Sequence, residues 1–182
     1  MSKVYLVLIV LILITANGCI SLFGPRPAKP ATKILTSLQN EVIQQDRLKQ
    51  GGPLLIVPFY AGVNVAATDE LNEMALRIVK GTVDTLQQAP SPFVILTAET
   101  AGQAELELTG KITQQNETGG LKKWIGKRKK ILSAAGKIVD VRTGDVILKF
   151  SRSREGKAGQ SFDDLGYQLG REIGQYILAQ AQ

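Results

Sequence analysis

The start of the chain is dominated by an apolar run that follows Lys3 and extends from Val4 to Ile14. This run is shorter than the roughly 20 apolar residues that a membrane-spanning helix needs. A basic first segment, a short apolar centre and small residues after it are the layout of a signal peptide. We therefore predict that residues 1–18 are a leader and that the folded part of the protein lies after them.

The single cysteine of the chain, Cys19, stands where such a leader would be cleaved, directly after Ala16, Asn17 and Gly18. These four residues resemble the lipobox of bacterial lipoproteins. The resemblance implies that Cys19 carries a diacylglycerol and that its new amino group receives a further acyl chain, such as palmitate. Ile20 stands where an Asp signals retention in the inner membrane, so the resemblance also implies an outer-membrane lipoprotein on the periplasmic side.

Two other interpretations of this N-terminus stay open. One is a plain secretory leader in which the cysteine is incidental, and the other is an anchor helix that is never cleaved. Several acyl chains, at about 0.8 kcal/mol per buried methylene group, hold a protein on a membrane durably, whereas one chain holds it weakly. The lipobox interpretation therefore predicts a protein that is tethered to the membrane and does not span it.

The lone cysteine and the absence of histidine exclude several kinds of chemistry. One cysteine cannot close an intramolecular disulfide, and without histidine the usual zinc ligand sets, the Ser-His-Asp triad and the Cys-His pair are all missing. The remaining residues offer no constellation typical of an active site. We predict that the chain is not an enzyme and that it needs no metal or cofactor beyond the acyl chains on Cys19.

Two short segments are predicted to connect the lipid to the folded domain. Residues 19–32 hold the lipidated cysteine and three prolines, a composition that favours an extended tether. Residues 33–52 are predicted to be a short amphipathic helix and a linker, because apolar residues from Lys33 to Gln50 recur every three to four positions before a Gly-Gly-Pro sequence. This helix is expected to pack on the domain, with binding to a partner as the alternative.

Residues 53–182 are predicted to form one α/β domain of the α+β type. The apolar run from Leu54 to Tyr60 is typical of a buried strand, with an irregularity at Pro58. The expected order is β-α-β-β-β-β-α, which favours a mixed sheet with the two main helices on one face. The other strands are expected at residues 93–98, 104–113, 131–141 and 145–154, and the helices are expected to begin after Thr68 and Ser161.

Three glycines recur at four-residue spacing in the last helix, at Gly166, Gly170 and Gly174. Such spacing favours helix dimerisation in a membrane span, but the charged residues of this helix make a span implausible. Glycine costs about 1 kcal/mol in a helix, so its repetition indicates a steric reason. We predict that the helix backbone packs closely on the sheet.

Three short motifs of the domain resemble a superfamily of envelope proteins. They are Ile56-Val57-Pro58-Phe59, Leu108-Thr109-Gly110-Lys111-Ile112 and the sequence VDVRTGDV from Val139 to Val146. They are similar to motifs of the N-terminal domain of TolB, of the curli-secretion-channel lipoproteins of the CsgG and HfaB group, and of the lipoproteins that activate penicillin-binding proteins. The resemblance covers residues 54–180 and implies a fold like that of anticodon-binding domains.

The same resemblance implies a function that depends on binding. The leading expectation is an adaptor or activator that binds an unidentified protein of a cell-envelope assembly, such as the machinery of peptidoglycan synthesis. The alternative is an oligomeric accessory component of a curli-type or polysaccharide-type export system, so the chain would also bind copies of itself. A secretion pore is not expected, because residues 115–130 and 151–160 are too short for paired barrel strands of about 9 to 11 residues each.

A basic segment from Gly119 to Lys130 is the candidate binding site in the sequence. It contains a tryptophan among lysines and an arginine and no acidic residue, so it could meet anionic lipid headgroups, an acidic protein surface or a cell-wall polymer. The alternative is a hairpin tip surrounded by solvent, and nucleic acid is not expected for an exported chain. The candidate residues are Lys122, Lys123, Trp124, Lys127, Arg128, Lys129 and Lys130.

Overall fold

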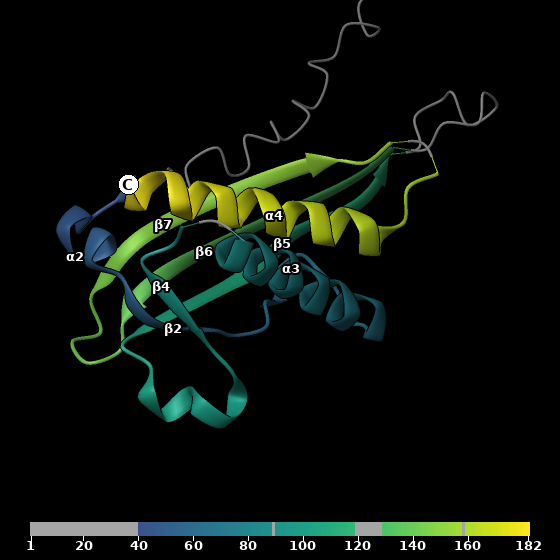
Figure 1. Ribbon diagram of the computed structural model, residues 1–182. Coiled ribbons are helices and arrows are strands. Elements are labelled where there is room, and N and C mark those ends of the chain that lie inside the picture. Colours follow the sequence, from purple (N-terminus) through teal and green to yellow (C-terminus); the bar gives the residue numbers. More distant parts are fainter. Residues whose placement is uncertain (1–39, 89, 119–128, 158) are drawn as a thin grey trace, which may run out of the picture. The chain divides into compact units, whose positions relative to one another are not determined.

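Seven strands form one mixed sheet in the computed structural model, which describes residues 40–88, 90–118, 129–157 and 159–182 (Figure 1). The strands lie in the order β1-β7-β6-β5-β2-β4, and β3 pairs with β5. Their bounds are β1 (Glu41–Val42), β2 (Gly52–Ile56), β3 (Tyr60–Ala61), β4 (Phe93–Leu96), β5 (Leu106–Thr118), β6 (Lys129–Asp140) and β7 (Val146–Glu155). The helices are α2 (Gln45–Gln50), α3 (Asp69–Gln88), η1 (Ala98–Gln103, a 3-10 helix) and α4 (Phe162–Ala181).

The predicted fold class and order of elements are confirmed. The long helix α3 connects β2 to the parallel strand β4, as a parallel connection requires. Strands β5, β6 and β7 then run antiparallel, and the β6–β7 turn uses Gly144 with a positive φ of 76°. The predicted leader, Cys19 and the tether lie outside the described residues.

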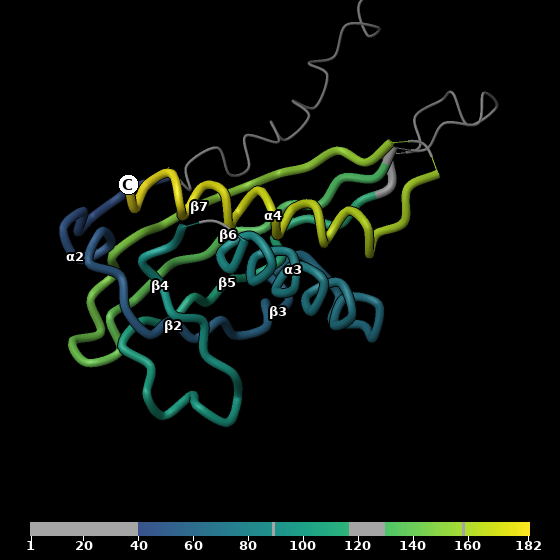
Figure 2. Tube along the Cα trace, in the orientation of Figure 1, coloured from purple at the N-terminus to yellow at the C-terminus, as the bar shows by residue number. Residues whose placement is uncertain are grey.

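The predicted irregularity at Pro58 divides the first apolar run into two strands. β2 ends at Ile56, although the backbone N–H of Val57 still donates to Leu108 O at 3.1 Å. Pro58 has no N–H to donate, so pairing stops and resumes in β3, where Tyr60 faces Lys111. Figure 2 shows this path from β2 through β3 towards α3.

Both long helices begin where the sequence predicts. In α3 the N–H of Leu71 donates to Thr68 Oγ1 at 3.2 Å, and in α4 the N–H of Asp164 donates to Ser161 Oγ at 3.0 Å. These hydroxyls satisfy backbone donors that have no partner in the first turn of a helix. The two caps therefore fix the starts of the helices locally.

The core lies between one face of the sheet and the two long helices. Leu108 of β5, Ile138 of β6 and Leu148 of β7 pair across the strands and are fully buried. Residues at alternate positions along these strands point to the opposite face, because the side-chain period of a strand is two. We call that opposite side the open face, since no helix of the described residues covers it (Figure 1).

The three glycines of α4 pack against α3, so the prediction that they face the sheet is wrong. A Cβ at Gly170 would overlap the carbonyl oxygen of Ile78, and a Cβ at Gly174 would lie 2.8 Å from Thr85 Cβ. From the other helix, a Cβ at Gly81 would overlap the carbonyl oxygen of Tyr167. Glycines on both helices therefore let the two backbones approach closely, while the leucine and isoleucine side chains of α4 fill the space above the sheet.

The segment from residue 40 to residue 52 differs from the predicted amphipathic helix. Val42 pairs with Leu148 in the edge strand β1, and the helix is confined to α2. Leu48 of α2 is fully buried in the core, so α2 packs on the elements that follow it. A free edge of β7 was available to this segment, and pairing with it satisfies backbone groups that an isolated short helix would leave to solvent.

The hairpin of β5 and β6 is longer than predicted. The pairing continues past the expected end at residue 113 to Thr118, which faces Lys129 across a register shift after Ile112. The polar residues there show no alternation with apolar ones, so no periodic pattern indicated this extension. The basic segment thus connects two paired strands, and its residues 119–128 lie outside the described part.

Candidate functional site

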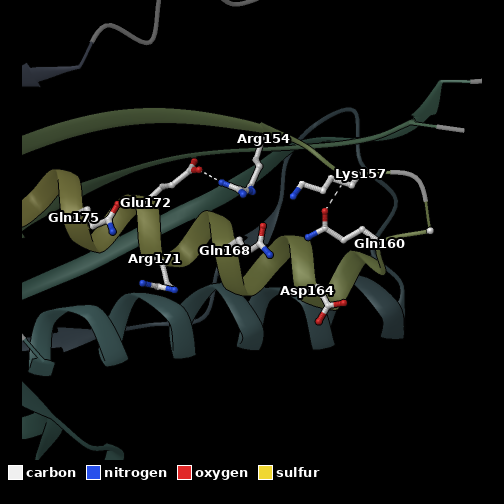
Figure 3. Close-up of a pocket in the computed structure, with 9 residues that line it drawn as sticks. Arg154, Lys157, Gln160, Asp164, Gln168, Arg171, Glu172 and Gln175 are labelled. Carbon is white, nitrogen blue, oxygen red and sulfur yellow. Dashed lines mark hydrogen bonds and ion pairs between the residues drawn. The ribbon is translucent and has the colours of Figure 1, made fainter. Parts of the chain in front are cut away.

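A polar groove of about 690 Å³ runs along α4 beside the end of β7. Figure 3 shows Arg154 of β7 pointing towards Glu172 of α4, with the glutamines of α4 on the same flank. We call this the α4 groove. Its lining residues are Arg154, Lys157, Gly159, Gln160, Asp164, Gln168, Arg171, Glu172 and Gln175.

The periods of the two elements explain why these polar side chains meet. Arg152 and Arg154 follow Leu148 and Phe150 on the helix-facing side of β7, beyond the point where the core needs apolar residues. On α4, Gln168, Glu172 and Gln175 are spaced by four and three residues, so they share one side of the helix. The groove forms where these two polar rows face each other.

Contacts within the groove hold its walls in place. Arg154 Nη1 forms an ion pair with the carboxylate of Glu172, and Arg154 Nε is buried without a hydrogen-bond partner among the described residues. Near the start of α4, the N–H of Lys157 donates to Gln160 Oε1 at 2.9 Å. A buried donor without a partner costs free energy, so this nitrogen weakens the wall of the groove slightly.

Two cation–π contacts also fasten α4 to the sheet beside the groove. The ammonium of Lys130 lies 4.5 Å from the centre of the Phe162 ring, and the guanidinium of Arg152 lies 4.0 Å from that of Tyr176. Burial raises the pKa of the Tyr176 phenol, and the nearby charge of Arg152 opposes this shift. Each such contact contributes on the order of 0.5 to 2 kcal/mol.

The chemistry of the α4 groove suits hydrogen bonding. Amides supply both donors and acceptors, while the basic and acidic side chains add charge of both signs. Within the described ranges, no group of three or more His, Cys, Asp or Glu is arranged to hold a metal ion. In that part of the chain, no helix is long and apolar enough to cross a membrane.

A second polar cluster lies at the other end of the sheet, around Arg47 of α2. Arg47 Nε donates to Asp140 Oδ2 at 3.0 Å, Nη2 to Glu105 Oε2 at 3.1 Å and Nη1 to the carbonyl oxygen of Gly51 at 2.6 Å. The hydrogen bond from Arg47 lowers the pKa of Asp140 from its usual 3.8. Burial of the carboxyl group raises this pKa, and hydrogen bonds from the backbone N–H groups of Thr143 and Arg142 lower it further. The cluster thus ties α2 to the sheet.

Replacing Asp140 by Asn is expected to destabilise the domain at neutral pH. A carboxylate with a lowered pKa adds stability above its unfolded pKa of about 3.8, and this stability is lost as the pH falls through the lower folded value. The melting temperature of Asp140→Asn should therefore lie below that of the wild type at pH 7 and approach it at pH 3. Circular dichroism melts at both pH values measure this, with Asp145→Asn as the exposed control. An equal difference at both pH values would contradict it.

The structure tests only a small part of the predicted basic site. Lys130 packs on Phe162 and pairs with Glu117 near the end of the β5–β6 hairpin that adjoins residues 119–128. The backbone of Lys129 belongs to β6, and the other predicted residues of the basic site lie outside the described part. The predicted lipobox, Ala16, Asn17, Gly18 and Cys19, also lies outside it. The sequence analysis missed the α4 groove, although the spacing of polar residues on α4 and the alternation of arginines with serines in β7 could have indicated it.

Comparison with known proteins supports the fold. No protein-family model matches the sequence, and no curated protein matches it significantly. A variant of PelC from Paraburkholderia phytofirmans, which forms a dodecamer, is 12% identical over 78% of this chain and 94% of that chain, with a TM-score of 0.52. A lipoprotein from Neisseria meningitidis is 17% identical over 69% of this chain and 97% of that chain, with a TM-score of 0.45.

This chain therefore shares the fold of PelC, and bacterial lipoproteins are among its structural neighbours. A putative lipoprotein from Caulobacter crescentus is a further one, 10% identical over 74% of this chain and 92% of that chain, with a TM-score of 0.39. The specific resemblance to the TolB and CsgG group stays a prediction.

Proposed function

We propose that this chain is a lipid-anchored lipoprotein of the bacterial outer membrane that faces the periplasm and acts as an adaptor. In this proposal Cys19 carries the acyl chains, and the α4 groove binds a polar segment of a protein in a cell-envelope assembly. The proposal assigns binding and not catalysis to the groove.

The observation that carries the proposal is the composition of the α4 groove. It is a concave site in which amide and charged side chains stand on two rigid elements, with Arg154 and Glu172 already paired with each other. A partner's polar backbone and side chains could replace water at these groups without losing hydrogen bonds. The presence of bacterial lipoproteins among the structural neighbours supports the envelope part of the proposal.

Replacing Gln168 and Gln175 together by Ala should weaken binding of the partner by roughly 30-fold. Each lost hydrogen bond costs about 1 kcal/mol, and each 1.4 kcal/mol is a tenfold change in affinity. The acylated protein would be cross-linked in cells, purified in mild detergent and analysed by quantitative mass spectrometry of its companions. The matched control replaces Gln87 and Gln88, two exposed glutamines of α3, by Ala. Equal recovery of every companion with both double variants would refute the groove as the binding site.

A second candidate function, an oligomeric component of an export system, is favoured by one observation. PelC, whose fold this chain shares, forms a dodecamer. The native mass of the same detergent-purified sample separates the two functions, after correction for the micelle. A discrete ring of many identical chains without a companion would favour the export component, and a small complex with a stoichiometric companion would favour the adaptor.

A further inference from the structure

Three lysines cluster on the open face of the sheet, opposite the helices. Lys137 of β6 lies between Thr109 of β5 and Lys149 of β7 in the strand register. Lys111 lies two residues beyond Thr109 on β5, so its side chain emerges on the same face. The row formed by Leu108, Ile138 and Leu148 lies one position away and is buried under the helices, which fixes the direction of the lysines.

These lysines border a shallow hollow of about 230 Å³. We call it the lysine hollow. The hollow forms because Ala135 carries only a methyl group and leaves space between its larger neighbours. Ala135 pairs with Lys111 on one side and with Ser151 on the other. Tyr60 of β3 stands beside Lys111 at the rim with 59% of its surface exposed. The side chains around the hollow are Tyr60, Thr109, Lys111, Ala135, Lys137 and Lys149.

The positive charge of the hollow is largely uncompensated within the described residues. Lys149 Nζ lies 3.4 Å from Glu41 Oε2, in an ion pair whose two side chains are 43% and 57% exposed. For the other two lysines of the hollow, the described part of the chain shows no ion pair. Glu107 shares the face and, like Lys111, lies two residues from Thr109, the register partner of Lys137, but on the side of Thr109 away from Lys111. Ammonium groups are compact donors that suit phosphate, and the hydroxyls of Tyr60 and Thr109 add further donors.

The place where the chain enters the domain favours a membrane as the source of the phosphate. Asn40 Oδ1 accepts hydrogen bonds from the N–H of Ser151 and from Arg152 Nη1 at 3.0 and 2.9 Å, so the chain joins the sheet at β7, the strand of Lys149. Residues 20–39 separate this point from Cys19. A fully extended chain of 20 residues spans at most roughly 70 Å, so a lipid on Cys19 would hold the β7 edge within that distance of the membrane.

We propose that the lysine hollow binds the phosphate of an anionic lipid headgroup in the membrane that holds the anchor. This inference rests on the lipid anchor of the proposed function. Binding through the open face lays the sheet on the membrane and leaves α3, α4 and the α4 groove on the side away from the lipid. The same domain can then hold a lipid and a protein partner at once.

Lysine labelling of the full acylated protein in vesicles tests this proposal. The vesicles contain phosphatidylcholine with or without phosphatidylglycerol, and mass spectrometry measures the acetylation rate of each lysine. Lys111, Lys137 and Lys149 should react at least about three-fold more slowly with phosphatidylglycerol, and high salt should remove the difference because it screens the charges. Lys49 and Lys80, which lie on helices, should react equally in both vesicles. Equal rates for the three lysines, or equal protection of all five, would overturn the proposal.

A titration with a soluble short-chain phosphatidylglycerol compares variants of the detergent-solubilised protein. Replacing Lys111, Lys137 and Lys149 together by Gln should weaken binding at least tenfold. The charge-matched control, with Lys49, Arg77 and Lys80 of the helices replaced by Gln, should bind like the wild type. Inorganic phosphate or a soluble uronic acid polymer that binds the wild type as tightly as the lipid would overturn the assignment to a membrane. Equal binding by both triple variants would overturn the site.

These measurements test the lipid anchor and the lipid-binding role of the lysine hollow separately. The mass of the N-terminal peptide reports whether Cys19 is acylated, independently of the lysine rates. Protected lysines in a protein without acyl chains would refute the anchor and keep the hollow. An acylated Cys19 with unprotected lysines would refute the hollow and keep the anchor.

Discussion

Replacing Gly170 by Ala is expected to lower the stability of the domain by about 3 kcal/mol, one of the two largest effects that we predict. The new Cβ would overlap the carbonyl oxygen of Ile78 and lie 2.9 Å from its carbonyl carbon. Backbone atoms cannot rotate away, so α3 and α4 would have to separate. That movement also strains the hydrogen bonds from Thr82 Oγ1 to the carbonyl oxygens of Ile78 and Gly170, at 2.9 and 3.1 Å.

The expected loss exceeds what the substitution gains locally. Alanine is favoured over glycine in a helix by about 1 kcal/mol, so an effect of helix propensity alone would raise the stability. For a domain of this size, 3 kcal/mol corresponds to a melting temperature roughly 6 to 12 °C lower. Thermal unfolding of the purified protein, followed by circular dichroism, measures the shift.

Glycine substitutions elsewhere provide the controls for this experiment. Gly102→Ala places its Cβ in open space, so its stability should stay within about 0.5 kcal/mol of the wild type. Gly81→Ala approaches the same contact from α3, where its Cβ would overlap the carbonyl oxygen of Tyr167, and should be about as damaging as Gly170→Ala. A Gly170→Ala protein as stable as the wild type would mean that the helices do not meet through their backbones.

Replacing Cys19 by Ala is expected to abolish acylation completely. Without the thiol no diacylglycerol can be attached, and the membrane affinity that several acyl chains give is lost. The wild-type chain should begin at Cys19 and carry the mass of the acyl chains. The Cys19→Ala chain should carry no acyl mass, and it should keep residues 1–18 or be cut elsewhere. Mass spectrometry of the N-terminal peptide and gel mobility of membrane and soluble fractions measure the change.

A neighbouring residue controls for the position of this substitution. Ser21→Ala lies two residues beyond the predicted cleavage point and should be acylated like the wild type. A Cys19→Ala protein that stays membrane-bound with the mass and mobility of the wild type would refute the lipoprotein interpretation. The secretory leader or the anchor helix would then explain the N-terminus.

The sequence determined the two long helices and the β6–β7 turn of this fold because their signals are local. Thr68 and Ser161 cap the helices that follow them, and Gly144 provides the positive φ of the β6–β7 turn. Each depends on side chains or backbone within a few residues, which the sequence displays directly. The class of the fold follows from the order of these elements, so it could be predicted before the structure.

The tertiary structure alone decided which surfaces these elements present to one another. The glycines of α4 showed that something approaches closely, but not that it is α3, and Val42 gave no sign of pairing with β7. The α4 groove depends on Arg154 and Glu172, which are far enough apart in sequence that no local pattern pairs them. A periodic pattern specifies which side of an element is buried, whereas the element that covers it is chosen by long-range packing of the whole chain.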